Sequence, residues 1–309
     1  MWIPQHCYKM KYLILIILLT TNIFPQNTYE GMNSWYHTSN AAMAGGGAAM
    51  ASAESDRMNP AAIFGISRLM HISLIQYPAD IQAKALTLII PRKANTIALS
   101  LRHLGYGDFE QYDEDGNRLG DYISGDTWMT GSTAYGFQDN KFLVGVTGGF
   151  FISQLEDYQS VVLTLAAGII YDIELIKMRL GLSLQNGGFV LTRYTSEKEK
   201  LPTALVASIN KRVAHLPLEL ALDVAYQLSK ETAYARFSGT FDLPHQFKLQ
   251  WGFNTNKLYQ QTGINYINDF FGSSGFGLAY DNQEYRFEFG GYFFTSGGWI
   301  VGMGMGIYF

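Results

Sequence analysis

Apolar and polar residues alternate along most of the chain after residue 66. Between residues 299 and 309 every odd position is apolar, and three of the even positions are glycine. Between residues 247 and 253, Phe, Leu, Trp and Phe alternate with Lys, Gln and Gly. A period of two is the period of a β-strand, whose side chains point to opposite faces in turn. The pattern therefore predicts an all-β chain whose strands each have one apolar face.

Polar or glycine-rich residues divide this region into fourteen alternating segments. Most are longer than the strands of soluble proteins, which average about 5–6 residues. They come closer to the ~9–11 residues that a tilted strand needs to cross a bilayer. We expect strands at residues 67–76, 82–91, 94–106, 126–138, 141–154, 160–173, 176–186, 202–213, 218–228, 233–242, 246–255, 274–281, 284–294 and 299–309.

A half-buried sheet of a soluble sandwich alternates as well. Here, however, aromatic residues gather at the segment ends, as in the interfacial girdles of membrane barrels. Strands in lipid satisfy their backbone hydrogen bonds only when the sheet closes. We therefore predict a transmembrane antiparallel β-barrel of about 14 strands, with both chain ends on the periplasmic side. The aromatic residues at the segment ends are Tyr106, Phe137, Tyr171, Tyr226, Phe241, Phe271, Tyr280, Phe294, Trp299 and Phe309.

The connections between the predicted strands are of two kinds. Several are tight turns of two to four residues, as at residues 139–140 and 282–283. Three are predicted to be long loops, at residues 107–125, 187–201 and 256–273. Outer-membrane barrels have short periplasmic turns and longer extracellular loops, so the long connections are expected to face the outside of the cell.

The N-terminus resembles a secretory signal peptide. Lys9 and Lys11 precede the apolar run at residues 12–19, and a more polar stretch follows up to Gln26. A charged start and a short apolar run are typical of a leader that is removed, and the run is shorter than the ~20 residues of a transmembrane helix. A buried N-terminal helix is the alternative. We predict a signal peptide at residues 1–26, with Met10 as a candidate start.

The composition agrees with a membrane barrel. Charged residues make up 16% of the chain, against about 25% in soluble domains. A formal charge of −4 gives no sign of a basic surface for nucleic acid. The single cysteine, Cys7, lies in the predicted leader, so no disulfide is expected. We predict localisation in the outer membrane of a Gram-negative-type bacterium, in contact with outer-membrane lipid.

Residues 27–66 lack the alternation and are rich in small side chains. Alanine and glycine dominate residues 41–51, and Asn59-Pro60 marks a turn. Small residues let backbone approach backbone. A flexible linker is the alternative, but such linkers seldom carry the Met, Ile and Phe residues found here. We predict a plug-like segment in the mouth of a barrel formed by residues 67–309.

The segment that ends in Asp56-Arg57-Met58-Asn59-Pro60-Ala61 resembles the N-terminal motif of FadL-like barrels. The chain resembles still more strongly the PorV/PorQ-type outer-membrane proteins of the type IX secretion system, through residues 112–126, 180–186 and 200–223. The resemblance implies a 14-stranded FadL-like barrel with an N-terminal plug. It also implies a role in protein export or in the passage of hydrophobic solutes. The plug motif residues are Asp56, Asn59, Pro60 and Ala61.

Candidate catalytic and metal-binding residues are scarce. The histidines do not have zinc-ligand spacing, and no common catalytic or phosphate-binding motif is present. The acidic run at residues 113–117 resembles part of a calcium loop but lacks the remaining ligands, so we interpret it as an extracellular hairpin turn. We predict no enzymatic activity, no metal and no cofactor. The histidines expected on the surface or in the pore are His37, His71, His103, His215 and His245.

Eight charged residues share strands with Leu- or Phe-rich faces and are expected to point into the lumen. A Lys or Arg that faces lipid at mid-bilayer costs about 2–4 kcal/mol. The charges could form a salt-bridged interior that holds a plug, or line a conduit with little ion selectivity because the signs are mixed. Phe309, at the end of an alternating strand, is similar to the assembly signal of outer-membrane proteins. The eight residues are Lys177, Arg179, Glu219, Asp223, Arg236, Lys248, Arg286 and Glu288.

Three functions follow from these patterns. The resemblance favours a non-enzymatic component or partner of a type IX secretion system, which predicts a sealed lumen and aromatic residues at the loop tips. The alternative is a FadL-like channel for hydrophobic solutes such as fatty acids, which predicts an apolar pocket near Asn59-Pro60-Ala61 and a lateral or axial opening. An outer-membrane enzyme is the least favoured and predicts a Ser, His and acid cluster within hydrogen-bond reach.

Overall fold

The computed structural model describes residues 29–113, 115–194, 199–255, 271–282, 284–294 and 298–309. The predicted signal peptide and most of the predicted loop at 256–273 lie outside these residues. Among the described residues, no helix is long and apolar enough to cross a membrane.

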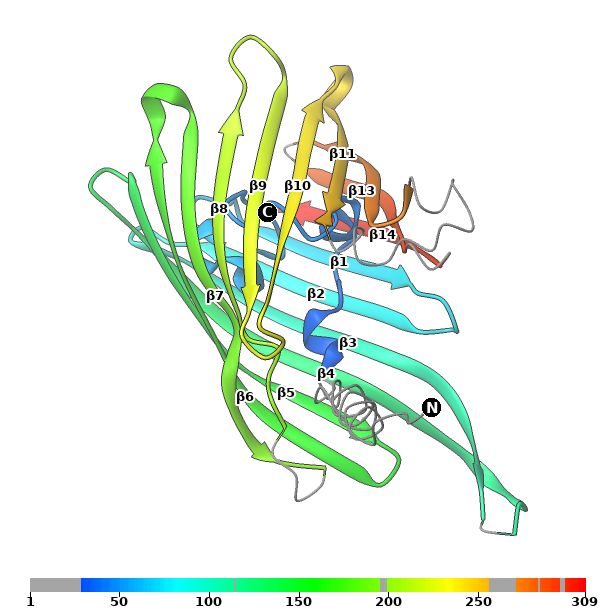
Figure 1. Cartoon of the computed structure of the whole chain (residues 1–309). Helices are drawn as coiled ribbons and strands as arrows, with labels where there is room; N and C mark the ends of the chain where they lie inside the picture. The colour runs from blue at the N-terminus through cyan, green and yellow to red at the C-terminus, as the bar shows by residue number, and fades with distance from the viewer. Residues whose placement is uncertain (1–28, 114, 195–198, 256–270, 283, 295–297) are drawn as a thin grey trace, which may run out of the picture.

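The described strands form one closed antiparallel barrel of fourteen, in which β1 pairs with β14 (Figure 1). This confirms the predicted fold class. The strands are β1 (Leu69–Gln76), β2 (Gln82–Pro91), β3 (Asn95–Tyr112), β4 (Arg118–Phe137), β5 (Phe142–Leu155), β6 (Tyr158–Ile173), β7 (Met178–Thr192), β8 (Ala204–Arg212), β9 (Leu218–Gln227), β10 (Thr232–Asp242), β11 (Phe247–Asn254), β12 (Ser274–Asp281), β13 (Tyr285–Phe293) and β14 (Trp299–Tyr308).

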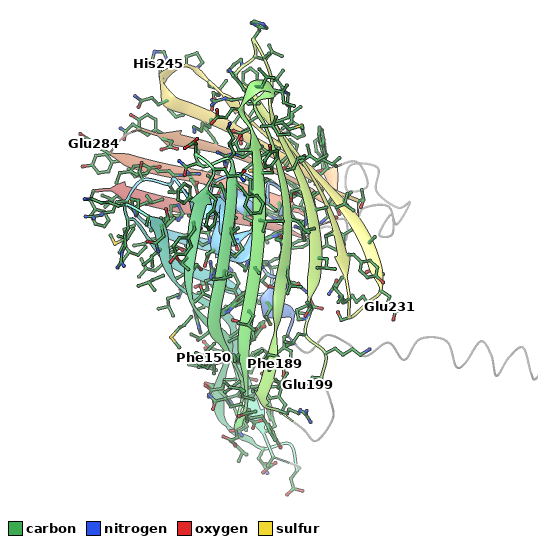
Figure 2. All side chains as sticks on the ribbon, turned by 90° about the vertical axis from the view of Figure 1, so that its left-hand side faces the viewer. Phe150, Phe189, Glu199, Glu231, His245 and Glu284 are labelled. Carbon is green, nitrogen blue, oxygen red and sulfur yellow. The ribbon has the colours of Figure 1, made fainter. Side chains whose placement is uncertain are left out.

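The alternating residues of the sequence lie on the inner and the outer face of the barrel wall. Along β1 buried and exposed residues alternate without interruption, and the exposed ones include Ile72, which is 54% exposed. Phe150 and Phe189 are likewise exposed on the outer surface of the wall (Figure 2). An apolar outer surface of this extent is unfavourable in water and favourable in hydrocarbon. The inner surface carries polar residues such as His71 and Ser73.

The two ends of the barrel differ. The turn end, with the short connections after β2, β4, β6, β8, β10 and β12, includes His245 and Glu284; the loop end includes Glu199 and Glu231 (Figure 2). Strands β3–β7 contain 14 to 20 residues, whereas the others contain 8 to 11. The barrel therefore has a tall wall, β3–β7, that projects at the loop end (Figure 1).

Two segments that were predicted to be loops are partly strands of the tall wall. Residues 107–112 and 118–125 extend β3 and β4, and residues 187–192 extend β7. The extension of β3 and β4 carries polar residues on both faces, so it lacks the apolar period of two that marks a membrane-crossing strand. A register shift between Gly105 and Asp108 separates the two parts of β3, and Gly107 has a φ of +91° there. Glycine tolerates such a φ without strain.

The aromatic residues at the strand ends fall into two groups, one on the outer face and one inside the barrel. Phe137, Tyr171, Tyr226 and Trp299 are 44–60% exposed on the outer face, as a girdle requires. Tyr106 and Phe294 instead pack against the buried core inside the barrel. Their position at a strand end does not determine the face, which depends on the register at each site.

Residues 29–66 lie inside the barrel as a plug. They form the 3₁₀-helix η1 (Glu30–Asn33), the α-helices α2 (Thr38–Ala42) and α3 (Ser55–Met58), and the 3₁₀-helix η2 (Pro60–Ile63). Residues 36–50 and 53–63 are all buried. Helix η2 contacts β4, β5 and β6, while α2 contacts β12, β13 and β14. Two further 3₁₀-helices, η3 (Glu174–Ile176) and η4 (Pro244–Gln246), lie in turns.

Candidate functional site

Asp56 forms a buried ion pair with the tall wall. Arg102 Nη2 lies 2.5 Å from Asp56 Oδ1, and the Thr130 hydroxyl donates to Oδ2 at 2.9 Å. Burial alone would raise the pKa of the Asp56 carboxyl, but the Arg102 guanidinium and the Thr130 hydroxyl outweigh it and hold that pKa below its ordinary value. Asp56 is therefore ionised at neutral pH and ties α3 to β3 and β4.

Glu54 and His37 extend this polar interior. Glu54 Oε1 accepts a hydrogen bond from Arg57 Nε at 3.0 Å. Burial raises the pKa of Glu54, but the charges of Arg57 and the contact with His37 lower it to about 2. Burial lowers the pKa of His37, so this imidazole is neutral at neutral pH. It stacks on His71 with ring centroids 5.4 Å apart, and His71 Nε2 lies 3.3 Å from Glu288 Oε2.

A hydroxyl, an imidazole and a carboxylate meet here, as an enzyme would require. His37 Nε2 lies 3.1 Å from Thr87 Oγ1, and His37 Nδ1 lies 3.7 Å from Glu54 Oε2. All three residues are fully buried, and none of them lines the cavities described below. A catalytic base must reach its substrate, so we assign the group to the plug–barrel contact. The expected surface or pore position is wrong for His37, whereas His71 faces the lumen and is covered there by His37 of the plug.

The Asn59-Pro60-Ala61 motif begins η2 and rests on the wall. The Asn59 side chain caps the helix by accepting from the Ala61 N–H at 3.2 Å, and its Nδ2 donates to the Ile169 carbonyl at 3.3 Å. Proline at the first position suits a helix start because its missing N–H would have no partner there. The motif residues are buried, and none of them lines a cavity described below. The apolar pocket expected beside the motif is therefore elsewhere.

Inward-facing glycines make this docking close. A Cβ on Gly145 would collide with the Pro60 and Ala61 backbone, and a Cβ on Gly168 would collide with the Asn59 side chain. Helix η2 can therefore pack this closely on the wall only because the wall has glycine at these positions. The same relation holds on the opposite side, where a Cβ on Gly275 would collide with the backbone of α2.

The eight charges expected in the lumen fall into three groups. Asp223 and Arg236 contact the plug backbone through hydrogen bonds to Gly47 and Gly45. Arg286 and Glu288 pair with each other beside His71. The other four lie round a cavity at the turn end together with Arg286; they are Lys177, Arg179, Glu219 and Lys248.

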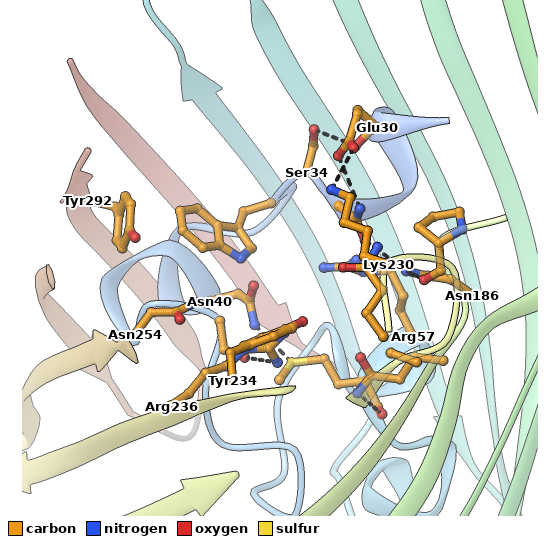
Figure 3. A pocket seen from close by; sticks show the side chains of 18 of the residues that line it. Glu30, Ser34, Asn40, Arg57, Asn186, Lys230, Tyr234, Arg236, Asn254 and Tyr292 are labelled. Carbon is orange, nitrogen blue, oxygen red and sulfur yellow. Dashed lines mark hydrogen bonds and ion pairs between the residues drawn. The ribbon is translucent and has the colours of Figure 1, made fainter. Parts of the chain in front are cut away.

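Two polar cavities flank the plug. The turn-end cavity has a volume of about 580 Å³ and is lined by charges from β6–β13. The loop-end cavity has about 380 Å³ and includes Arg57, Lys230, Arg236 and several amide side chains among its lining residues (Figure 3). Aromatic rings of Trp35 and Tyr292, with centroids 4.4 Å apart, form part of its wall.

An apolar cavity of about 700 Å³ lies at the loop end against the tall wall. We call it the mouth cavity. Phe109, Leu155 and Tyr158 line it and are 37%, 49% and 60% exposed. Few of its lining groups are polar; one of them is the Tyr106 hydroxyl, which donates to Asp126 Oδ2 at 2.6 Å. Ligand pockets of roughly 300–1,000 Å³ with apolar walls and a few polar groups are typical of small-molecule sites.

Sequence reasoning missed Arg102 and the mouth cavity. Arg102 alternates with Leu99 and Leu101 on β3, so the criterion that selected the eight charges also fits it. The cavity was missed because its residues lie in the extensions of the tall wall and in loops. Phe309 was predicted as an assembly signal; it is 64% exposed, and the Arg68 guanidinium lies 5.4 Å from its ring centroid.

The acidic hairpin at residues 113–117 is held by its own side chains. Asp113 Oδ1 accepts from the N–H groups of Asp115 and Asn117 at 3.0 and 2.7 Å. The Asn117 side-chain amide donates to Asp113 Oδ2 at 3.0 Å, and this bond, with the one from the Asn117 N–H, holds the pKa of the exposed Asp113 carboxyl below its ordinary value. In the part of the chain that the structure describes, no group of three or more His, Cys, Asp or Glu side chains is arranged to hold a metal ion.

No family model matches the sequence, and no curated protein matches it. Several solved structures are similar to it. The Pseudomonas putida toluene transporter TodX is similar with a TM-score of 0.56 and 10% identity, over 87% of this chain and 96% of that one. A deltaS2 mutant of the TodX monoaromatic hydrocarbon channel gives 0.55 and 12%, over 88% and 96%.

A Pseudomonas aeruginosa FadL homologue is similar with a TM-score of 0.50 and 11% identity, over 88% of this chain and 98% of that one. At such low identities the likeness establishes the fold alone. The chain therefore has the fold of FadL-type outer-membrane barrels, and the FadL-like part of the resemblance is confirmed. The PorV/PorQ subfamily stays a prediction.

Proposed function

We propose that this chain is an outer-membrane channel for hydrophobic solutes, and the observation that carries the proposal is the mouth cavity. An apolar molecule gains about 25 cal/mol for each Å² of its surface that leaves water. Phe109, Leu155 and Tyr158 offer such a surface at the loop end, which faces the cell exterior in this orientation. The fold shared with TodX and a FadL homologue supports the same function.

The route from the cavity into the membrane is also part of the proposal. A hydrocarbon is unfavourable in the charged lumen because it would displace water without replacing its hydrogen bonds. The ladder between β7 and β8 ends at Gln185 and Ala204, so residues 186–192 have described strand partners on β6 only. Tyr194 and Glu199, from the connection beside this edge, line the mouth cavity. We place a lateral exit at this edge.

Uptake by cells tests the proposal. A strain that lacks the gene is complemented with the wild-type chain or with Phe109→Asp/Leu155→Asp, and the entry of a radiolabelled long-chain fatty acid and of toluene is measured. A charge in an apolar pocket opposes apolar ligands, so we expect the variant to lose most of the uptake. Tyr112→Asp is the matched control, because Tyr112 is exposed on the same hairpin and does not line the cavity. Uptake by the double variant at the wild-type level would refute the proposal.

A partner role in type IX secretion is the second candidate, and the plug favours it. Residues 36–50 and 53–63 are buried in the lumen, which fits a barrel that serves as a wall for other chains. Exposed aromatic side chains near the loop tips, Tyr112 and Tyr158, fit the same role. The deletion strain separates the two functions: loss of secreted proteins with normal uptake favours the partner role, and lost uptake with unchanged secretion favours the channel.

A further inference from the structure

Two polar cavities approach each other through the plug on the side of β7–β13. The loop-end cavity is lined by Gln185, Tyr234 and Arg236, among others, and the turn-end cavity by Arg179, Glu219 and others. Asn40 of α2 lines both cavities. Only a thin part of the plug therefore separates the two ends of the lumen here.

The thin part is a turn rich in glycine, residues 44–47, which we call the glycine turn. Gly45 lines the loop-end cavity, whereas Gly46 and Gly47 line the turn-end cavity. A single stretch of backbone thus touches both cavities. Ala44, Gly45 and Gly47 have φ values of +52°, +76° and +87°, a left-handed conformation in which the two glycines are unstrained and the alanine is not.

Two wall residues hold the glycine turn in place. Asp223 of β9 accepts a hydrogen bond from the Gly47 N–H at 2.6 Å and another from the Ala48 N–H at 3.3 Å. Arg236 of β10 donates to the Gly45 carbonyl at 2.8 Å. The turn carries no side chain larger than methyl that could anchor it in a wall pocket. The wall holds it through these backbone hydrogen bonds.

The closed arrangement leaves polar atoms without partners. Among the described residues, Asn40 Oδ1, Arg236 Nε and Ser238 Oγ are buried and make no hydrogen bond. Ser238 lies beside the turn, because a Cβ on Gly46 would sit 2.5 Å from its Oγ. Buried polar groups are usually paired, and an unpaired one is unfavourable. Water that entered when the turn moved aside would satisfy all three atoms, which lowers the cost of opening.

We propose that the glycine turn is a gate and that its displacement joins the two cavities into a path for small hydrophilic solutes. Amide, hydroxyl and charged side chains line both cavities, so solutes that exchange hydrogen bonds with water are the class that fits. Charges of both signs occur along the path, so neutral solutes such as pentoses are favoured over ions of one sign. Hydrophobic solutes are excluded, and the path is independent of the mouth cavity.

Swelling of liposomes in arabinose tests the gate. Wild-type protein reconstituted at full length is compared with Asp223→Asn, which removes the charge that holds the Gly47 N–H. Asparagine keeps one oxygen that accepts from Gly47, but a hydrogen bond to a neutral group is about half as strong as one to a charged group, and we expect a rise in swelling rate of about five- to tenfold. Asp281→Asn is the control, because Asp281 pairs with Lys248 and Arg286 and lines neither cavity. An Asp223→Asn barrel that swells at the wild-type rate contradicts the gate.

A disulfide provides a second test that keeps Asp223 intact. In Gly46→Cys/Ser238→Cys the two Cβ atoms would lie 3.0 Å apart, which a shift of a few tenths of an ångström brings to the ~3.5–4.5 Å of a disulfide. Cys7 is replaced by serine in this background. Combined with Asp223→Asn, the oxidised pair should return swelling to the wild-type rate, and reduction should restore the increase.

A tether elsewhere on the plug supplies the matched control. Ala42→Cys/Gly290→Cys joins α2 to β13 at a Cβ–Cβ distance of 3.1 Å and leaves the glycine turn free. With Asp223→Asn, its oxidation should leave swelling elevated. Equal inhibition by both disulfides would mean that the whole plug must leave the barrel, and no inhibition by the Gly46–Ser238 disulfide would mean that solutes pass elsewhere. Either result overturns the proposal.

Discussion

The plug meets the barrel in two different ways. On the tall wall, α3 and η2 are held by the buried Asp56–Arg102 pair and by close packing on Gly145 and Gly168. On the side of β9 and β10, the glycine turn is held by hydrogen bonds between wall side chains and its backbone. The same segment is therefore fixed on one side and adjustable on the other.

Removal of the buried Arg102 guanidinium should destabilise the fixed side of the plug contact more than any other change. Arg102→Met leaves Asp56 buried without its ion partner, and breaking a buried pair costs about 3–5 kcal/mol. The free energy of unfolding in detergent micelles, from urea titration, measures the loss. Arg118→Met is the control, because Arg118 is 54% exposed in the β3–β4 hairpin and exposed ion pairs contribute about 0–1 kcal/mol. Equal effects of the two substitutions would contradict the distinction.

Overfilling the docking surface should have the next largest effect. A Cβ on Gly145 would collide with the Pro60 and Ala61 backbone, whereas a Cβ on Gly148 of the same strand would meet nothing within 4 Å. Overpacking a core costs about 1–3 kcal/mol. Gly145→Ala should expose the plug to added protease at a concentration that leaves Gly148→Ala intact. Similar proteolysis of both variants would show that η2 does not dock as described.

Acid should weaken the plug contact through its own carboxyls. The pKa of Glu54 is lowered to about 2 from an ordinary 4.5, and that of Asp56 is lowered as well. Their stabilising effect is complete above the ordinary values and is lost as pH falls toward the folded ones. The lowered pKa of His37 acts in the same direction, since an undocked plug would take up the proton. Protease protection of the plug should begin to fall near pH 6.5, where an undocked His37 takes up its proton, and should fall most steeply between about pH 4.5 and pH 2.

The steep part of that acid effect should disappear when the two carboxyls are removed. In Glu54→Gln/Asp56→Asn the carboxyls no longer titrate, so plug protection should be lower at neutral pH, and only the shallower fall that His37 causes should remain in acid. A double variant with the same acid transition as the wild type would assign the transition to His37 or to groups on the barrel wall.

The helix cap should contribute the smallest effect. Asn59→Ala removes the bond to the Ala61 N–H and the weaker one to Ile169. Loss of an N-cap costs about 0.5–2 kcal/mol. Asn59→Ser keeps a capping oxygen and should recover most of the loss in thermal unfolding. Failure of serine to recover it would assign the effect to the Ile169 contact.

The barrel could be predicted from sequence because lipid imposes a period of two on every strand that crosses it. The tall wall could not, because residues such as Asp108, Glu110 and Asp121 leave no apolar face to read. The inward direction of Asp223 follows from alternation. Its partner, Gly47, lies 176 residues away, and only the closure of the barrel brings the two together.

The candidate site shows the same limit. The motif Asp56–Ala61 could be recognised as a plug segment, but the apolar pocket expected beside it lies instead at the mouth, between residues of β3, β4, β5, β6 and two loops. No local pattern marks such a cavity, because each strand contributes only one to three residues. The burial of His37 could not be predicted for the same reason, since it depends on long-range packing of the plug against the wall.

Hydrogen exchange of the reconstituted barrel tests the asymmetric plug most directly. The account predicts that amides of the glycine turn and Ala48 exchange at least ~10-fold faster than those of α3 and η2, because opening the turn breaks a few hydrogen bonds to the wall whereas α3 and η2 are fixed by a buried ion pair. It also predicts that Asp223→Asn accelerates amide exchange only in the glycine turn and Ala48. Equal protection of the two regions, or acceleration of both together, would contradict it.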